Sequence, residues 1–143
     1  MSPDQPAAER IRFELGQIEK ELKVVDRLNA PGLDALDEIQ VRAAATVLHS
    51  VYNGIEKILL MALEERKVKI GESAHWHSEV LSYAASTGII SEHVLTELRD
   101  FLGFRHFFRH NYGFILDDQL VKPLMAKVRL TVSQFASELE QLG

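Results

Sequence analysis

Apolar residues recur every three or four positions along most of this chain, and charged residues fill the positions between them. Such spacing is typical of amphipathic helices that bury one face. It predicts helices at about 6–28, 34–68, 76–85, 91–111 and 118–142. No segment alternates apolar and polar residues as a half-buried strand does. We therefore expect an all-α fold, an up-and-down bundle of about five helices with one long second helix.

The predicted second helix is long for a chain of this size. Asn29-Ala-Pro31-Gly32 separates it from the first helix, and Asp34 is its expected N-cap. A helix of roughly 35 residues spans about 50 Å, which exceeds what a small bundle needs for its own core. The surplus suggests a partner subunit. Further along, Thr87-Gly88 is expected to close the third helix and Ser91 to cap the fourth.

The composition indicates one globular domain over residues 1–143, with residues 1–8 as a flexible N-terminus. Hydrophobic residues make up 46% of the chain and charged residues 26%. There is no cysteine, which excludes disulfides, thiolate nucleophiles and thiolate metal sites. The N-terminus is polar and no apolar run is long enough to span a membrane. We expect a soluble, cytoplasmic protein without a membrane partner.

The charge balance limits how the chain could bind nucleic acid. The formal net charge is −5 and the isoelectric point is about 5.7. A protein that coats a phosphate backbone is normally basic. This argues against a general DNA or RNA binder, and any RNA contact must depend on a local basic patch.

Aromatic residues, arginines and histidines are most densely interleaved in residues 101–114. Arg105 and Tyr112 are seven residues apart and share one helical face, a stripe that otherwise resembles core. An arginine there suggests a structured anion site or an intersubunit contact. Alternatively, Arg105 and Arg109 snorkel or pair with nearby acids: Glu97, Asp100 or Asp117.

Arg105, His110 and Tyr112 match the Arg-X4-His-X-Tyr motif of HepT-like toxins, a branch of the HEPN superfamily. The chain is similar to this branch over nearly all residues after about 9. The likeness includes the second helix with Tyr52-Asn-Gly-Ile-Glu-Lys-Ile-Leu59, the Trp76 helix, the Gly88-Ile-Ile-Ser91 turn and the aromatic-rich fourth helix.

This resemblance implies a metal-independent endoribonuclease without a cofactor, acting on RNA as the toxin of a toxin–antitoxin pair. It implies proton transfer by His110 and phosphate stabilisation by Arg105, with two copies of the motif meeting across a homodimer cleft. His106, Arg109 and Asn111 would support the pair or contact RNA. The residue types suit these tasks, because histidine titrates near neutral pH and arginine presents a charged fork to phosphate. By helical spacing, His110 lies nearly half a turn from Arg105. Bringing the motif together therefore requires the helix to end near residue 111 or a second subunit to contribute.

The resemblance also implies a cognate nucleotidyltransferase-type antitoxin that transfers AMP to Tyr112 and silences the enzyme. A bound AMP would place a phosphate against Arg105 and fill the RNA groove. From the residues alone, Tyr112 is equally interpreted as a packed aromatic whose hydroxyl caps a neighbour.

Other polar residues admit less specific interpretations. His75 and His77 flank Trp76, but residues two apart diverge on a helix and no third metal ligand is obvious, so we interpret them as a solvated helix start. The charge run at 64–69 is interpreted as a solvated helix end. His49 and His93 are expected to be surface or satisfied interfacial residues.

Two other functions remain open on the sequence. One is a non-catalytic HEPN protein that binds nucleotides or serves as a scaffold for a nucleotidyltransferase, which the acidic charge favours. The other is a helical dimer whose aromatic segment only packs.

Overall fold

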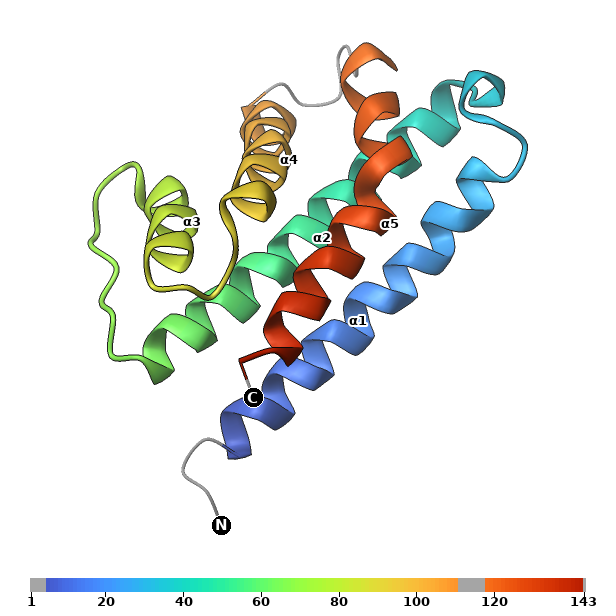
Figure 1. Ribbon diagram of the computed structural model, residues 1–143. Coiled ribbons are helices and arrows are strands. Elements are labelled where there is room, and N and C mark those ends of the chain that lie inside the picture. Colours follow the sequence, from blue (N-terminus) through green and yellow to red (C-terminus); the bar gives the residue numbers. More distant parts are fainter. Residues whose placement is uncertain (1–4, 111–117, 143) are drawn as a thin grey trace.

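The computed structural model describes residues 5–110 and 118–142, with side chains described for 6–107 and 119–142. These residues form five α-helices and one turn of 3₁₀ helix, with no strand among them (Figure 1). The expected all-α fold with a long second helix is confirmed. The elements are α1 (Gln5–Asn29), η1 (Leu33–Ala35), α2 (Glu38–Glu65), α3 (Trp76–Ser86), α4 (Glu92–His110) and α5 (Asp118–Glu140).

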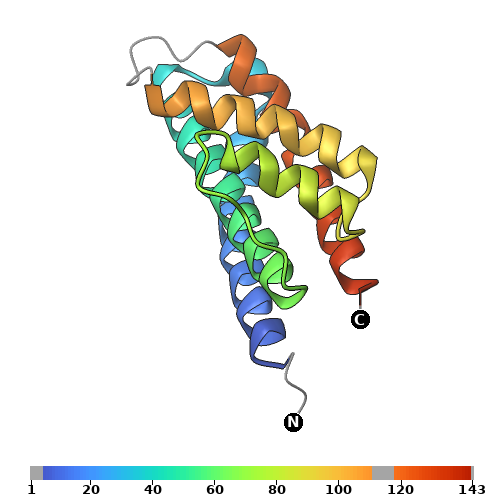
Figure 2. The ribbon, with the colours of Figure 1, turned by 90° about the vertical axis from the view of Figure 1, so that its left-hand side faces the viewer.

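Helix α2 is the central element of the bundle. It packs against α1, α3, α4 and α5, and α1 runs antiparallel beside it (Figure 1). Helices α3 and α4 form a hairpin that crosses α2 obliquely, as Figure 2 shows. The largest fully buried side chains come from all five helices and include Leu22, Tyr52, Leu81, Leu98 and Phe135. Each fully buried apolar side chain contributes about 1.5–3 kcal/mol.

Glycine 54 allows α1 to approach α2 closely. A β-carbon at Gly54 would lie 2.8 Å from Cγ1 of Ile18, closer than such atoms come in proteins. Ile18 is itself buried in the core. The glycine in the middle of the long helix is therefore explained by packing and not by a break in the helix.

The start of α2 differs from the sequence prediction. The N-cap is Asp37, whose carboxylate Oδ1 accepts a hydrogen bond from the Gln40 amide at 2.8 Å. The Gln40 side-chain oxygen accepts one from the Asp37 amide at 2.9 Å, which completes a capping box. Asp34, the predicted cap, lies in η1 instead. The prediction was wrong because the 3₁₀ turn absorbs the first residues after Gly32.

The end of α2 also differs, at Glu65 instead of the predicted residue 68. Lys67 takes a left-handed conformation with φ of 58°. Its N–H donates to the Glu64 carbonyl at 2.9 Å, and the Val68 N–H donates to the Leu63 carbonyl at 3.0 Å. This pair of bonds is a Schellman motif, which terminates a helix.

The same motif ends α3, but with glycine at the left-handed position. Gly88 has φ of 82°, and the Ile89 N–H donates to the Ala84 carbonyl at 2.9 Å.

We expect Lys67→Gly to raise the free energy of unfolding by about 1 kcal/mol, because a side chain strains this conformation. Gly88→Ala should lower it by a similar amount. Urea unfolding measures the free energy of unfolding of both variants. A Lys67→Gly variant that is less stable than the wild type would contradict the left-handed conformation of Lys67.

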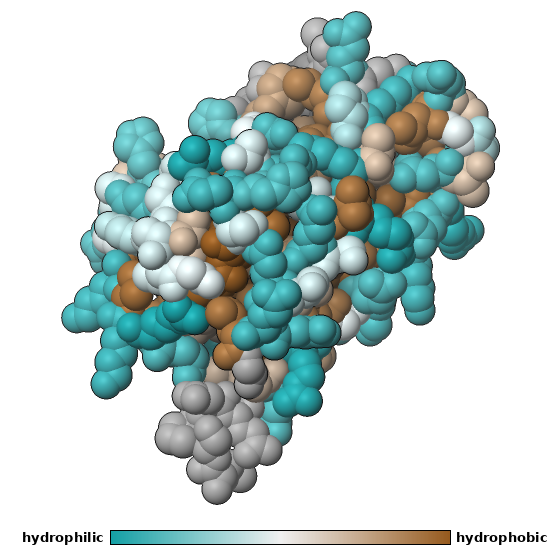
Figure 3. Space-filling view, in the orientation of Figure 1, coloured by the Kyte–Doolittle hydropathy of each residue, from teal (hydrophilic) through white to brown (hydrophobic). Residues whose placement is uncertain are grey.

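The first and last helices and the surface differ in part from the sequence prediction. Residues 5–8, expected to be flexible, form the first turn of α1, and α5 ends at Glu140 instead of residue 142. Two large apolar residues, Ile39 and Leu120, are 78% and 41% exposed, and each lies near the first turn of its helix. Figure 3 shows hydrophilic side chains over most of one face, with apolar patches between them. None of the described helices is long and apolar enough to cross a membrane.

Candidate functional site

The start of α4 is fixed by Ser91, as the sequence predicted. The Ser91 hydroxyl oxygen accepts a hydrogen bond from the Val94 amide at 3.1 Å, which caps the helix. The amide and hydroxyl of Ser91 both donate to the carboxylate of Glu138 on α5, each at 2.7 Å. These bonds attach the beginning of α4 to the end of α5.

The middle of α4 is attached to α5 through Lys127. Its ammonium group donates to Glu97 at 2.7 Å and to Asp100 at 2.6 Å. Although partial burial lowers the pKa of Lys127, the two carboxylates outweigh it and leave the pKa above its ordinary value. Lys127 thus binds two of the three acidic residues that the sequence analysis considered as partners of Arg105.

Arg105 itself binds a neutral partner on α2. Its Nε–H donates to the side-chain oxygen of Asn53 at 3.1 Å, and the residue is half-buried. Pairing of Arg105 with Glu97 or Asp100 was therefore the wrong alternative. Asp117, the third candidate acid, lies outside the described residues.

Asn53 continues this contact to His49 one turn earlier on α2. The Asn53 amide nitrogen lies 3.1 Å from Nε2 of His49. The sequence predicted a surface or satisfied interfacial residue at His49, and the structure places it half-buried with this contact to its own helix. Together, His49, Asn53 and Arg105 form the polar cluster that we call the arginine anchor, where the C-terminal end of α4 crosses α2 (Figure 2).

A second polar group lies beside the arginine anchor. Glu56 is only 6% exposed, and its carboxylate lies 2.7 Å from Nδ1 of His77 on α3. Tyr52 is buried nearby, with no hydrogen bond of ordinary geometry for its hydroxyl among the described residues. Burial raises the pKa of Tyr52 above its ordinary value, the Glu56 carboxylate raises it further, and the charge of Arg105 opposes the rise. Tyr52 therefore stays a neutral phenol.

The structure corrects the interpretation of His77 as part of a solvated helix start. The His77 ring is half-buried, bonded to Glu56 and stacked on Trp76 with ring centroids 3.6 Å apart. His75, by contrast, is exposed. No group of three or more possible metal ligands occurs in the part of the chain that the structure describes.

We expect His77→Ala to lower the free energy of unfolding by about 1–3 kcal/mol, because it leaves the buried Glu56 carboxylate without its partner. His75→Ala, two residues away, is the matched control and should change stability by less than about 0.5 kcal/mol. Urea unfolding monitored by circular dichroism measures both. Equal effects of the two substitutions would contradict the Glu56–His77 pairing.

The remaining motif residues lie at or beyond the end of α4. His106 is exposed, one position after Arg105, and His110 is the last residue of the helix. The side chains of Arg109 and His110 are outside the described part, and so are Asn111 and Tyr112 entirely. The structure thus brings Arg105 to α2 but leaves the rest of the predicted site untested. Basic residues suit this position, because a helix C-terminus carries a partial negative charge.

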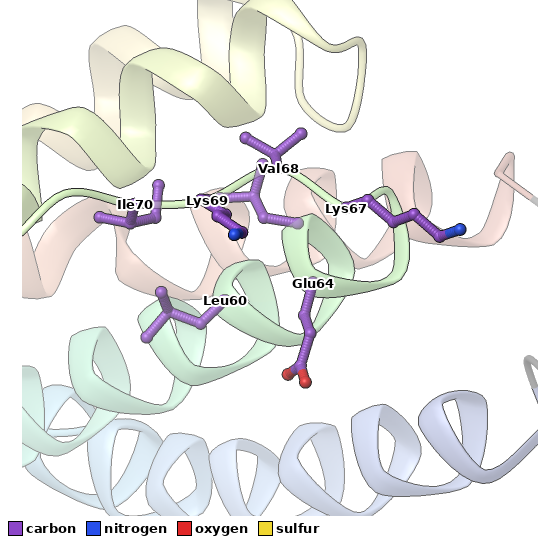
Figure 4. A pocket seen from close by; sticks show the side chains of 7 residues that line it. Leu60, Glu64, Lys67, Val68, Lys69 and Ile70 are labelled. Atoms are coloured by element: carbon purple, nitrogen blue, oxygen red, sulfur yellow. The ribbon is translucent and has the colours of Figure 1, made fainter.

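A pocket near the other end of α2 involves none of the predicted site residues. Figure 4 shows it between the end of α2 and the segment that follows. Its lining is Leu60, Leu63, Glu64, Lys67, Val68, Lys69 and Ile70. The charged residues of the run at 64–69 are all exposed at the end of α2, so the interpretation as a solvated helix end is confirmed, and the apolar Leu60, Val68 and Ile70 lie beneath them in the pocket.

Comparison with known families decides the assignment. A family model described as HepT-like protein matches residues 43–143, which covers α2 from its second turn onward. The chain belongs to the HepT-like family. No curated protein and no solved structure matches it significantly. The resemblance drawn from the motif and helix order is confirmed at the level of the HepT-like family within the HEPN superfamily.

Sequence reasoning missed Asn53 and Glu56 as polar partners in this HepT-like protein. Both occur in the segment 52–59 that resembles the family, and both are half-buried or buried polar residues on a helix that is otherwise largely apolar. The spacing of His49, Asn53 and Glu56 would place them along one side of α2. Which residues of α3 and α4 meet them depends on how the hairpin crosses α2, and spacing does not give this.

Proposed function

We propose that this HepT-like protein is a metal-independent endoribonuclease, the toxin of a HEPN/nucleotidyltransferase toxin–antitoxin pair. The observation that carries the proposal is the Arg105-X4-His110-X-Tyr112 motif in a chain that belongs to the HepT-like family. Its Arg105 is bound by the neutral Asn53 amide, and within 6–107 and 119–142 no carboxylate forms an ion pair with it, which supports a role for its charge. A full positive charge is what a phosphate-stabilising arginine needs.

In the proposed reaction, the 2′-oxygen of RNA attacks the adjacent phosphorus and the bond to the 5′-oxygen breaks. His110 serves the proton transfers, taking the proton from the 2′-hydroxyl or giving one to the leaving 5′-oxygen. Arg105 stabilises the negative charge that gathers on the phosphate oxygens. With two motifs facing each other in a homodimer, the two copies of His110 divide these tasks. The products are a 2′,3′-cyclic phosphate and a free 5′-hydroxyl.

A homodimer cleft would also reconcile RNA cleavage with the acidic chain. The net charge of −5 opposes broad nucleic-acid binding. Two copies each of Arg105, His106, Arg109 and His110 in one groove would make a local cationic site, with Asn111 as a further RNA contact.

Sedimentation velocity at micromolar concentration should give a dimer, and a monomer would contradict the shared cleft.

The function is tested by incubating the purified protein with RNA in excess EDTA. We expect cleavage that resists the chelator, elutes with the dimer on size exclusion and persists in an Arg129→Ala variant, since Arg129 pairs with Asp26 on the surface. Complete absence of cleavage would favour the non-catalytic alternative, a HEPN nucleotide-binding or scaffolding partner of a nucleotidyltransferase. The acidic net charge is the observation that favours this second candidate.

A further inference from the structure

We infer that Asn53 is a positioning residue for Arg105 and that His49 locks Asn53 in the orientation this requires. The inference rests on the proposed ribonuclease role of Arg105. It starts from the two contacts of the arginine anchor, Arg105 Nε to Asn53 Oδ1 at 3.1 Å and Asn53 Nδ2 to His49 Nε2 at 3.1 Å.

Hydrogen-bond polarity fixes the direction of both contacts. A guanidinium group only donates, so the oxygen of the Asn53 amide must face Arg105. The Asn53 amide nitrogen, which also only donates, then faces His49. Nε2 of His49 must accept in this contact, which places the ring proton of a neutral His49 on Nδ1, a buried atom with no hydrogen bond to the described residues. A flipped Asn53 amide would set N–H against N–H at Arg105, and the histidine acceptor therefore stabilises the productive orientation.

The anchor fixes the guanidinium without consuming its charge. Only the Nε–H takes part in the bond to Asn53, so the N–H groups on both terminal nitrogens are not used in it. Arg129 gives the contrast within the same protein. Its Nε and Nη2 both bind the Asp26 carboxylate, at 2.9 Å and 2.6 Å, which neutralises the group. A neutral anchor orients an arginine that must still attract a phosphate.

The inference predicts how RNA cleavage responds to removal of each link. Asn53→Leu should lower kcat by about 10- to 100-fold with KM changed by less than about threefold, because a misplaced arginine loses transition-state stabilisation while other groups still bind RNA. His49→Leu should lower kcat in the same way. His49→Gln supplies an amide oxygen near the place of Nε2 and should restore kcat to within about threefold of the wild type. Asn29→Leu is the matched control, since it removes another interhelical amide bond, to the Met125 carbonyl, and should leave kcat unchanged.

A spectroscopic readout separates this inference from the proposed function. In ¹H–¹⁵N NMR spectra, the Nε–H of Arg105 should exchange slowly with solvent in the wild type and in His49→Gln. Exchange should be at least about tenfold faster in Asn53→Leu, because the bond that protects the proton is gone. This measurement needs no RNA, so it decides the anchor even if the wild type does not cleave.

The results that overturn the inference are equally specific. If Asn53→Leu cleaves RNA like the wild type, Asn53 does not position Arg105 for the reaction. If the Arg105 Nε–H exchanges at the wild-type rate in that variant, the hydrogen bond from Arg105 to Asn53 does not protect it and the anchor is contradicted. An equal loss of kcat in His49→Gln and His49→Leu would contradict the inference that His49 orients the Asn53 amide by accepting its hydrogen bond. Far-ultraviolet circular dichroism and thermal unfolding of each variant identify any loss of activity that comes from misfolding, in which case Asn53→Ser replaces Asn53→Leu.

Discussion

Replacing His110 with alanine should lower the rate of RNA cleavage by about 10²–10⁴-fold, the contribution typical of a positioned general acid or base. Arg105→Ala should cost about 10²–10³-fold, because the charge developing on the phosphate then has no fixed cation. Single-turnover cleavage of a short RNA in EDTA measures both rates.

The double variant gives a sharper expectation than either single variant. Groups that act on one transition state are not additive, so Arg105→Ala combined with His110→Ala should be little slower than the worse single variant. His93→Ala, an exposed histidine at the other end of α4, and Arg129→Ala are the matched controls. Retention of more than about a tenth of the wild-type rate by His110→Ala would contradict its role in proton transfer.

Transfer of one AMP to Tyr112 by a cognate nucleotidyltransferase should silence cleavage, with an effect as large as loss of Arg105. The added phosphate is negative and would compete with RNA for the same arginine. Co-expression with the nucleotidyltransferase followed by intact-mass measurement and a cleavage assay tests this. The expected result is a mass increase of one AMP group that disappears in Tyr112→Phe.

The chain offers a natural control for this modification, because it has three tyrosines. Tyr52 is 1% exposed and Tyr83 is 41% exposed, so Tyr83 is an accessible acceptor outside the motif. Tyr83→Phe should still gain AMP and lose activity. Modification that persists in Tyr112→Phe but disappears in Tyr83→Phe would contradict the assignment of Tyr112.

Local sequence signals predicted most of the fold, because they act through the residues that carry them. Ser91 caps α4 where its hydroxyl meets the first turn, and Gly88 ends α3 because glycine tolerates a left-handed backbone. The same reasoning failed at the end of α2. Lys67 takes the left-handed conformation although it is not glycine, and a lysine gives no sequence signal for that conformation.

The candidate site was predictable only in part, for a different physical reason. The motif at Arg105 could be found because its residues are close in sequence. The partner of Arg105 could not, because Asn53 is 52 positions away and the contact depends on where α4 crosses α2. The nearer acids at Glu97 and Asp100 looked like better partners, but Lys127 on α5 takes both. His77 was misjudged likewise, since its partner Glu56 comes from another helix.

In the proposed reaction the 2′-hydroxyl of RNA is the nucleophile, and His110 and Arg105 assist it without a metal. Cleavage in EDTA of a short RNA, compared with the same RNA bearing a single 2′-deoxy nucleotide at the cleavage position, tests this claim. The predicted result is cutting of the all-RNA strand to a 2′,3′-cyclic phosphate and no cutting at the deoxy position. Cleavage at the deoxy nucleotide, or cleavage of the all-RNA strand only when a divalent metal is added, would contradict it.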